Sequence, residues 1–132
     1  MLKITLSSSL KYKEIVRDTI KNLELLGILA VFPNLDSGVA KEDVNVEFMK
    51  KLEADHFSAI DTSSALYIIC PGGYVGTLVS VEVGYAIGKG KSVVFSEQPE
   101  DLGLRALTTK IIGLDKLDEF NNGLSPYMKN IQ

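Results

Sequence analysis

The sequence predicts an α/β fold in which a parallel sheet of five strands carries helices on both faces. Two observations lead to this fold. Short apolar runs alternate along the 132 residues with longer segments of helical spacing. The stretch from Ala65 to Glu97 also reads as strand, glycine-rich turn, helix and strand, the βαβ unit of parallel sheets. No repeat, low-complexity tract or linker interrupts the chain, so residues 1–132 are expected to form a single domain.

The first half of the chain is expected to supply two strands and two helical segments. Leu2–Leu6 has a short strand pattern that ends at three serines. Leu10–Leu26 carries apolar residues at helical spacing, and Gly27 ends this helix. Ile28–Phe32 reads as the second strand, and a loop follows it. Lys41–Asp61 is polar with a spaced apolar face, which indicates one helix or two consecutive helical pieces.

The second half begins with the strand that we expect at the centre of the sheet. Ala65–Cys70 is a continuous apolar run, too short for a buried helix and bounded at once by Pro71. The apolar helix after Gly76 ends at Gly88-Lys89-Gly90. Each connection is long enough for a right-handed crossover, which favours a small doubly wound fold of the flavodoxin or Rossmann type. The later elements are expected to be a strand at Ser92–Phe95, a short helix at Leu102–Leu107, a strand at Lys110–Leu114 and a helical turn at Asp115–Phe120.

Composition narrows the possible partners. The chain has 45% hydrophobic residues, a net charge of -3 and a pI near 5.1. It therefore lacks the excess of positive charge that binding to nucleic acid or to an anionic membrane requires. Small-molecule ligands are the expected partners. The single Cys70 excludes an internal disulfide and argues against a zinc site, and we expect neither a metal nor a cofactor. A secretion leader and a membrane-length apolar run are both missing from the sequence, which leads us to expect a cytoplasmic protein.

Glu82 is the first candidate for a functional residue, because it lies in the most apolar helix of the chain. A solvent-facing glutamate near the positive end of the helix dipole is the ordinary interpretation. Alternatively, Glu82 lies at the carboxyl edge of a parallel sheet, where doubly wound proteins bind ligands. His56, within a turn of the central strand, is either an ordinary surface or half-buried residue or a second candidate. Ser7, Ser8 and Ser9 follow the first strand, where such residues cap a helix or bind a ligand.

Four motifs resemble the nucleoside 2-deoxyribosyltransferase family and its nucleotide N-hydrolase relatives. An H-x-x-x-I segment occurs at His56–Ile60, G-Y-x-G at Gly73–Gly76, E-x-G-Y-A at Glu82–Ala86 and G-K-x-V at Gly90–Val93. The resemblance extends from Ile4 to about Leu117, and E-x-G-Y-A with the following G-K-x-V is its most specific part.

The resemblance implies chemistry at the N-glycosidic bond of a (deoxy)nucleoside or its 5'-phosphate. Glu82 would be the nucleophile on the anomeric carbon, as a carboxylate is in retaining glycosidases. A homodimer or higher homo-oligomer is also implied, in which tail residues reach the pocket of a neighbour, with Asn121, Asn122 and Tyr127 as candidates. The expected substrate-binding residues are Ser7, Ser8, Ser9, Gly73, Tyr74, Gly76, His56 and Asp61.

The chain differs from the family pattern at three positions. Gly76 stands where an acidic residue often lies six positions before the nucleophile, and His56 stands where transferases often carry an aspartate. Ser64 replaces an aspartate that commonly precedes the third strand, and Asp61 is the acidic residue three positions earlier.

Two alternatives remain open. Pro71–Thr77 resembles the P-G-G-x-G-T signature of the cytokinin-activating phosphoribohydrolases, with one residue inserted before Gly76. A non-catalytic nucleotide-binding module is the other alternative, because a glycine turn before a helix binds ribose or phosphate without chemistry.

Overall fold

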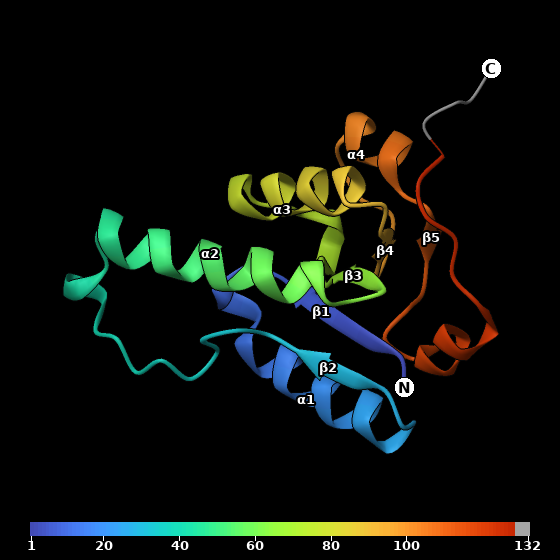
Figure 1. Ribbon diagram of the computed structural model, residues 1–132, viewed down its shortest axis with the longest axis horizontal. Coiled ribbons are helices and arrows are strands. Elements are labelled where there is room, and N and C mark those ends of the chain that lie inside the picture. Colours follow the sequence, from blue (N-terminus) through green and yellow to red (C-terminus); the bar gives the residue numbers. More distant parts are fainter. Residues whose placement is uncertain (129–132) are drawn as a thin grey trace.

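The computed structural model describes residues 1–128, and its centre is a sheet of five parallel strands in the order β2-β1-β3-β4-β5. This confirms the expected parallel α/β fold, with the first and third strands as neighbours (Figure 1). The strands are β1 at Lys3–Ser7, β2 at Leu29–Val31, β3 at Ala65–Ile68, β4 at Ser92–Phe95 and β5 at Lys110–Ile111.

Four α-helices connect the described strands. Gly27 follows α1 with a φ of +78°, which confirms the expected glycine stop. The Asn45 side chain caps α2 by accepting a hydrogen bond from the Phe48 N–H at 2.9 Å. The helices are α1 at Lys13–Leu25, α2 at Val46–Asp61, α3 at Thr77–Gly88 and α4 at Leu102–Leu107, and shorter 3₁₀ turns occupy Leu10–Tyr12, Lys41–Asp43, Pro71–Gly73 and Leu117–Asn122.

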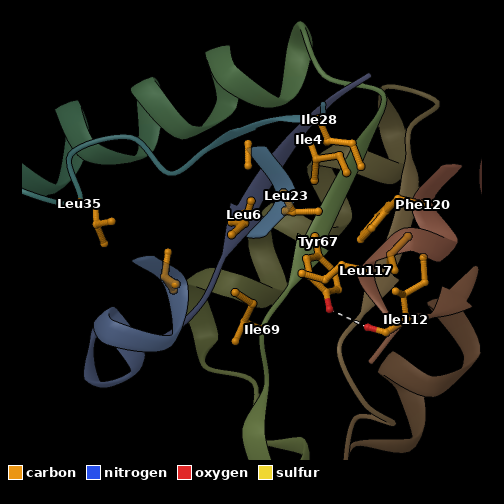
Figure 2. Close-up of a cluster of buried hydrophobic side chains, with 13 residues drawn as sticks. Ile4, Leu6, Leu23, Ile28, Leu35, Tyr67, Ile69, Ile112, Leu117 and Phe120 are labelled. Carbon is orange, nitrogen blue, oxygen red and sulfur yellow. Dashed lines mark hydrogen bonds between the residues drawn. The ribbon is translucent and has the colours of Figure 1, made fainter. Parts of the chain in front are cut away.

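Each face of the sheet has its own core. On one face, α1 and the 3₁₀ turn at Leu117–Asn122 pack against the sheet, and Figure 2 shows the side chains of this cluster. There the rings of Tyr67 and Phe120 meet edge to face at 4.9 Å, and the Tyr67 hydroxyl donates to the Ile112 carbonyl at 2.6 Å. On the other face α2, α3 and α4 cover the sheet, and α2 and α3 lie in contact (Figure 1).

The alternation along β1 positions the polar residues. Ile4 and Leu6 belong to the core on the α1 face. Thr5 and Ser7 point to the opposite face, where Thr5 contacts Ser63 at 2.7 Å and Ser7 contacts α3. Ser7 is also the last residue of β1, so its hydroxyl lies at the carboxyl edge of the sheet, beneath α2 and α3. None of the helices in residues 1–128 has both the length and the apolar character needed to cross a membrane.

Candidate functional site

A cavity of about 300 Å³ lies at the carboxyl edge of the sheet. Its walls come from α2, the first half of α3 and the segments that follow β1, β2 and β3. Edges of this kind are where doubly wound proteins bind ligands. The lining residues are Ser8, Ser9, Leu10, Phe32, Met49, Leu52, Glu53, His56, Tyr74, Gly76, Thr77, Leu78, Val79 and Glu82.

Glu82 lies in the cavity wall with only 4% of its surface exposed. It shares the buried side of α3 with Val79, Val83 and Ala86, so the helix turns it toward the sheet. The Ser7 hydroxyl donates a hydrogen bond to Glu82 Oε1 at 2.5 Å. The solvent-facing interpretation of Glu82 is therefore wrong, because its carboxyl group is buried and held from β1.

His56 is buried beside this carboxyl group. Its Nε2 lies 3.3 Å from the Leu6 carbonyl oxygen and 3.9 Å from Glu82 Oε1, and the second distance is too long for a hydrogen bond. A carbonyl only accepts, so the contact with Leu6 requires the proton on Nε2. Phe32 meets the imidazole edge to face, with ring centroids 5.0 Å apart. Burial lowers the pKa of His56, although Glu53 acts in the opposite direction when it is ionised, and the ring is neutral near neutral pH.

Glu53 is a second acid in the cavity, and our sequence interpretation missed it. Met49, Leu52, Glu53 and His56 follow one another at spacings of three, one and three residues, which puts them on one face of α2. This spacing from His56 is the signal in the sequence that could have identified Glu53. It lines the same cavity as Glu82, and the two carboxyl groups lie close enough for each to shift the pKa of the other.

The two carboxyl groups have different environments. Burial raises the pKa of Glu82, whereas the hydrogen bonds from Glu53 and Ser7 act to lower it. Burial, followed by the hydrogen bond to Glu82, raises the pKa of Glu53 from its ordinary 4.5 to about 7. Glu82 receives the donors that stabilise a carboxylate, and so the pair retains its proton on Glu53.

This arrangement predicts how stability depends on pH. Between pH 4.5 and about 7 the folded chain holds a proton on Glu53 that the unfolded chain has released. The resulting stabilisation is complete below this window and is lost as the pH rises through it. We expect the thermal midpoint to fall with rising pH across the window, and to fall less steeply in Glu53→Gln. Equal slopes in Glu53→Gln and in the exposed-site control Glu47→Gln would contradict this prediction.

Ser8, Ser9, Tyr74 and Gly76, which the sequence predicts as binding residues, also line the cavity. The Ser8 hydroxyl donates to the Ile69 carbonyl at 2.9 Å, which ties the end of β1 to the end of β3. Ser9 stands at the N-cap of a 3₁₀ turn, but its side chain makes no capping hydrogen bond. The expectation of a capping serine is therefore not met at Ser9, and its hydroxyl remains on the cavity wall.

Two other predicted binding residues lie outside the cavity. Gly73 packs against the backbone of residues 98–100, and its carbonyl accepts from the Glu100 N–H at 2.9 Å. Asp61 is the last residue of α2, where it accepts a hydrogen bond from the Tyr85 hydroxyl at 2.7 Å. The helix rises about 1.5 Å per residue, so Asp61 lies about 12 Å along α2 from Glu53. The structure therefore does not bring Gly73 and Asp61 together with Glu82.

The tail residues lie at another edge of the sheet. Asn121 lines a separate hollow with Leu2, Ser64 and Ser92, which belong to the amino ends of strands β1, β3 and β4 or precede them. Asn122 and Tyr127 follow in the same tail and do not line the cavity that holds Glu82. Their contact with a neighbouring copy stays a prediction. Among residues 1–128 there is no group of three or more His, Cys, Asp or Glu side chains placed to hold a metal ion.

Comparison with known proteins yields matches in structure only. No protein-family profile matches the chain, and no curated protein matches it in sequence. One similar structure is the 2-deoxyribosyltransferase of the psychrotolerant bacterium Bacillus psychrosaccharolyticus, with a TM-score of 0.68 and 15% identity over 96% of this chain and 99% of that one. A conserved protein from Enterococcus faecalis V583 matches with a TM-score of 0.60 and 16% identity over 90% of this chain and 98% of that one.

The third structure is the CMP N-glycosidase BcmB of Clostridium botulinum. It has a TM-score of 0.58 and 17% identity over 91% of this chain and 98% of that one. At such identities a structural match establishes the fold and leaves the reaction open. The chain thus has the fold of 2-deoxyribosyltransferases and nucleotide N-glycosidases over nearly its whole length, which confirms the expected likeness at the level of the fold.

Proposed function

We propose that this protein breaks the N-glycosidic bond of a (deoxy)nucleoside or its 5'-phosphate and passes the sugar to water or to another base. The observation that carries the proposal is Glu82, a buried carboxyl group that Ser7 orients in the wall of a cavity at the carboxyl edge of a parallel sheet. The likeness in fold to enzymes of this bond supports it. Expected binding residues at the cavity are Ser7, Ser8, Ser9, Tyr74, Gly76 and His56.

The chemistry follows from the position of Glu82. A carboxylate oxygen attacks the anomeric carbon as the bond to the base breaks, through a transition state with oxocarbenium character. The Ser7 hydrogen bond fixes one carboxylate oxygen, and so it reduces the reorganisation needed before the attack. The resulting glycosyl ester on Glu82 is then resolved by water or by a second base.

The walls of the cavity suit the two halves of a nucleoside. Phe32, Met49 and Leu52 form an apolar side that can bury a planar base. Ser8 and Ser9, which follow β1, also line the cavity, and their hydroxyl oxygens can accept hydrogen bonds from sugar hydroxyls. The volume of about 300 Å³ lies at the lower end of the range typical of small-molecule sites.

A non-catalytic nucleotide-binding module is the second candidate. One observation favours it: the N-cap residue of α3 is Gly76, which offers no side-chain cap, and Gly76, Thr77 and Leu78 line the cavity. The backbone N–H groups at a helix N-terminus bind a phosphate without any chemistry. In this case the protein would retain a 5'-nucleotide intact.

A panel of nucleosides and 5'-nucleotides, assayed for release of the free base, separates the two candidates. Base release in the presence and absence of an acceptor base also separates transfer from hydrolysis. We expect release from at least one member of the panel. Tight binding of a nucleotide in calorimetry, with no base released from any compound, would establish the binding module and overturn the enzyme.

We further expect a second copy of the chain to cover the mouth of the cavity. Tyr74 and Leu78, at the mouth of the cavity, are 49% and 43% exposed, so the cavity is open to water. A glycosyl ester in an open cavity would be hydrolysed before a second base could resolve it. Val81, on the next turn of α3, is 49% exposed and continues this apolar surface outside the cavity.

Light scattering at micromolar concentration is therefore expected to give the mass of a dimer or larger assembly. Val81→Glu is expected to shift the mass toward the monomer, since it places a charge in the apolar contact. Leu25→Glu, on the exposed side of α1, is the control and should leave the mass unchanged. A strict monomer for the unaltered chain would contradict this prediction.

A further inference from the structure

Among the described residues of the cavity wall, Glu53 is the acid that the proposed chemistry at Glu82 leaves without a role. It is half-buried on the face of α2 that carries His56, and it shares the cavity wall with Glu82, whose carboxyl group shifts its pKa. The two carboxyl groups come from different helices, α2 and α3, so tertiary packing alone brings them together.

The contacts of Glu53 indicate which carboxyl group carries the proton. Glu53 Oε2 is buried and has no hydrogen-bond donor among the described residues. As a carboxylate, Glu53 would therefore leave a buried acceptor unsatisfied beside a second negative charge. Protonation removes the second negative charge and lowers the cost of burial, and the Glu53 O–H can then donate to the Glu82 carboxylate. The Ser7 hydroxyl already donates to Glu82 at 2.5 Å, which makes Glu82 the better acceptor.

The charged and titratable groups that face Glu53 are few. Glu82 faces it from α3, and His56 lies one turn further along α2. His56 is neutral near neutral pH because burial lowers its pKa. It therefore places no positive charge beside Glu53 and Glu82 at that pH. No lysine or arginine occurs among the described residues that line the cavity. The proton on Glu53 is therefore governed by Glu82 and by burial.

We infer that Glu53 is the acid–base partner of Glu82: it protonates the departing base and then deprotonates the molecule that resolves the glycosyl ester. This inference rests on the proposed function. It assigns to one half-buried side chain of α2 the proton transfers that a nucleophile alone does not supply.

The proton and electron balance of the two steps is complete. In the first step a Glu82 oxygen forms a bond to the anomeric carbon, and the electron pair of the broken C–N bond goes to the base, which takes the Glu53 proton. In the second step water, or the N–H of an incoming base, attacks the anomeric carbon and gives its proton to the Glu53 carboxylate. The electron pair of the broken ester bond returns to Glu82.

The leaving group provides the sharpest test. The second-order constant kcat/KM is measured for two substrates, a nucleoside that the panel identifies and the 4-nitrophenyl glycoside of the same sugar. 4-Nitrophenolate departs as a stable anion and needs no acid, whereas a nucleobase does. We expect Glu53→Gln to lower kcat/KM for the nucleoside by about a hundredfold or more, and for the nitrophenyl glycoside by less than about tenfold. Glu47→Gln, an exposed glutamate of the same helix, is the matched control and should change neither constant.

The pH profile gives a second readout, which a purely structural role would not move. For the nucleoside, kcat/KM of the unaltered protein should fall as the pH rises through the Glu53 pKa of about 7. In Glu53→Gln this fall should disappear. An equal loss on both substrates would make Glu53 a positioning residue, and no loss on either would give it no part in the reaction. Both outcomes overturn the inference but leave the proposed function intact, provided that Glu82→Gln is inactive on both substrates.

A measurement on the unaltered chain covers the case in which Glu53→Gln does not fold. With ¹³C-labelled glutamate, the carboxyl carbon of Glu53 is expected to titrate at about 7 in NMR spectra of the free protein. Titration near the ordinary 4.5 would overturn the inference, because such an acid is already ionised at neutral pH. Failure of the unaltered protein to release base from any compound would instead overturn the proposed function, and with it the inference.

Discussion

Glu82→Gln is expected to lower the rate of base release by several orders of magnitude while the fold and nucleoside binding survive. The amide has the shape of the carboxyl group, and its oxygen can still accept the hydrogen bond from Ser7. It lacks the negative charge that attacks the anomeric carbon, so the covalent step loses its nucleophile. Initial rates with the best substrate of the panel give the loss, and calorimetry gives the affinity.

The controls for Glu82→Gln address its burial. Because Glu82 is only 4% exposed, a general loss of structure could imitate a loss of catalysis. The thermal midpoint must therefore stay close to that of the unaltered chain, and Glu47→Gln must retain full activity. Loss of stability without selective loss of turnover would make Glu82 a structural residue. Unchanged base release by Glu82→Gln would exclude the covalent mechanism.

The sequence was a good guide to the sheet because its strands are short apolar runs with clear ends. The predicted fourth strand at Ser92–Phe95 has the observed bounds, and Pro71 closes the third strand region as expected. The last strand is shorter than predicted, Lys110–Ile111 in place of Lys110–Leu114. It lies at the edge of the sheet, where only β4 can pair with it, so the ladder ends as soon as the two strands diverge.

The cavity was predictable in part. Glu82 was identifiable because a carboxylate in an apolar helix breaks the local pattern, and the serines were identifiable because they end a strand. Glu53 was harder to identify, because apart from its spacing of three residues from His56 it resembles the other acids of a helix rich in charged residues. Its contact with Glu82 depends on how α2 packs against α3, and spacing along the chain does not encode that packing.

For Gly73 the sequence predicts a contact with ligand, but the structure shows a contact with another loop of the chain. The glycine turn was expected to admit a ligand, and Gly76 does line the cavity. Gly73 instead allows a close approach between two loops of the chain. It has a φ of +82°, and a Cβ atom there would lie 2.9 Å from the Gln98 carbonyl oxygen and 3.0 Å from the Glu100 backbone nitrogen. Both contacts are with backbone, which side-chain rotation cannot relieve.

Gly73→Ala is therefore expected to destabilise the protein by about 3 kcal/mol or more, which combines the cost of the left-handed backbone with that of the steric overlap. The matched control is Gly72→Ala. Gly72 has a φ of +71°, but nothing lies within 4 Å of its Cβ position. The control should thus lose only the backbone part, about 1–2 kcal/mol.

Urea unfolding of both variants measures this difference as the free energy of unfolding in water. The substitution would also disturb the hydrogen bond from the Glu100 N–H to the Gly73 carbonyl and shift the neighbouring Tyr74, which lines the cavity. We therefore expect Gly73→Ala to weaken nucleoside binding as well, whereas Gly72→Ala should not. Equal losses of stability in the two variants would mean that the loop at 98–100 moves aside without cost, and that the positive φ alone requires glycine at position 73.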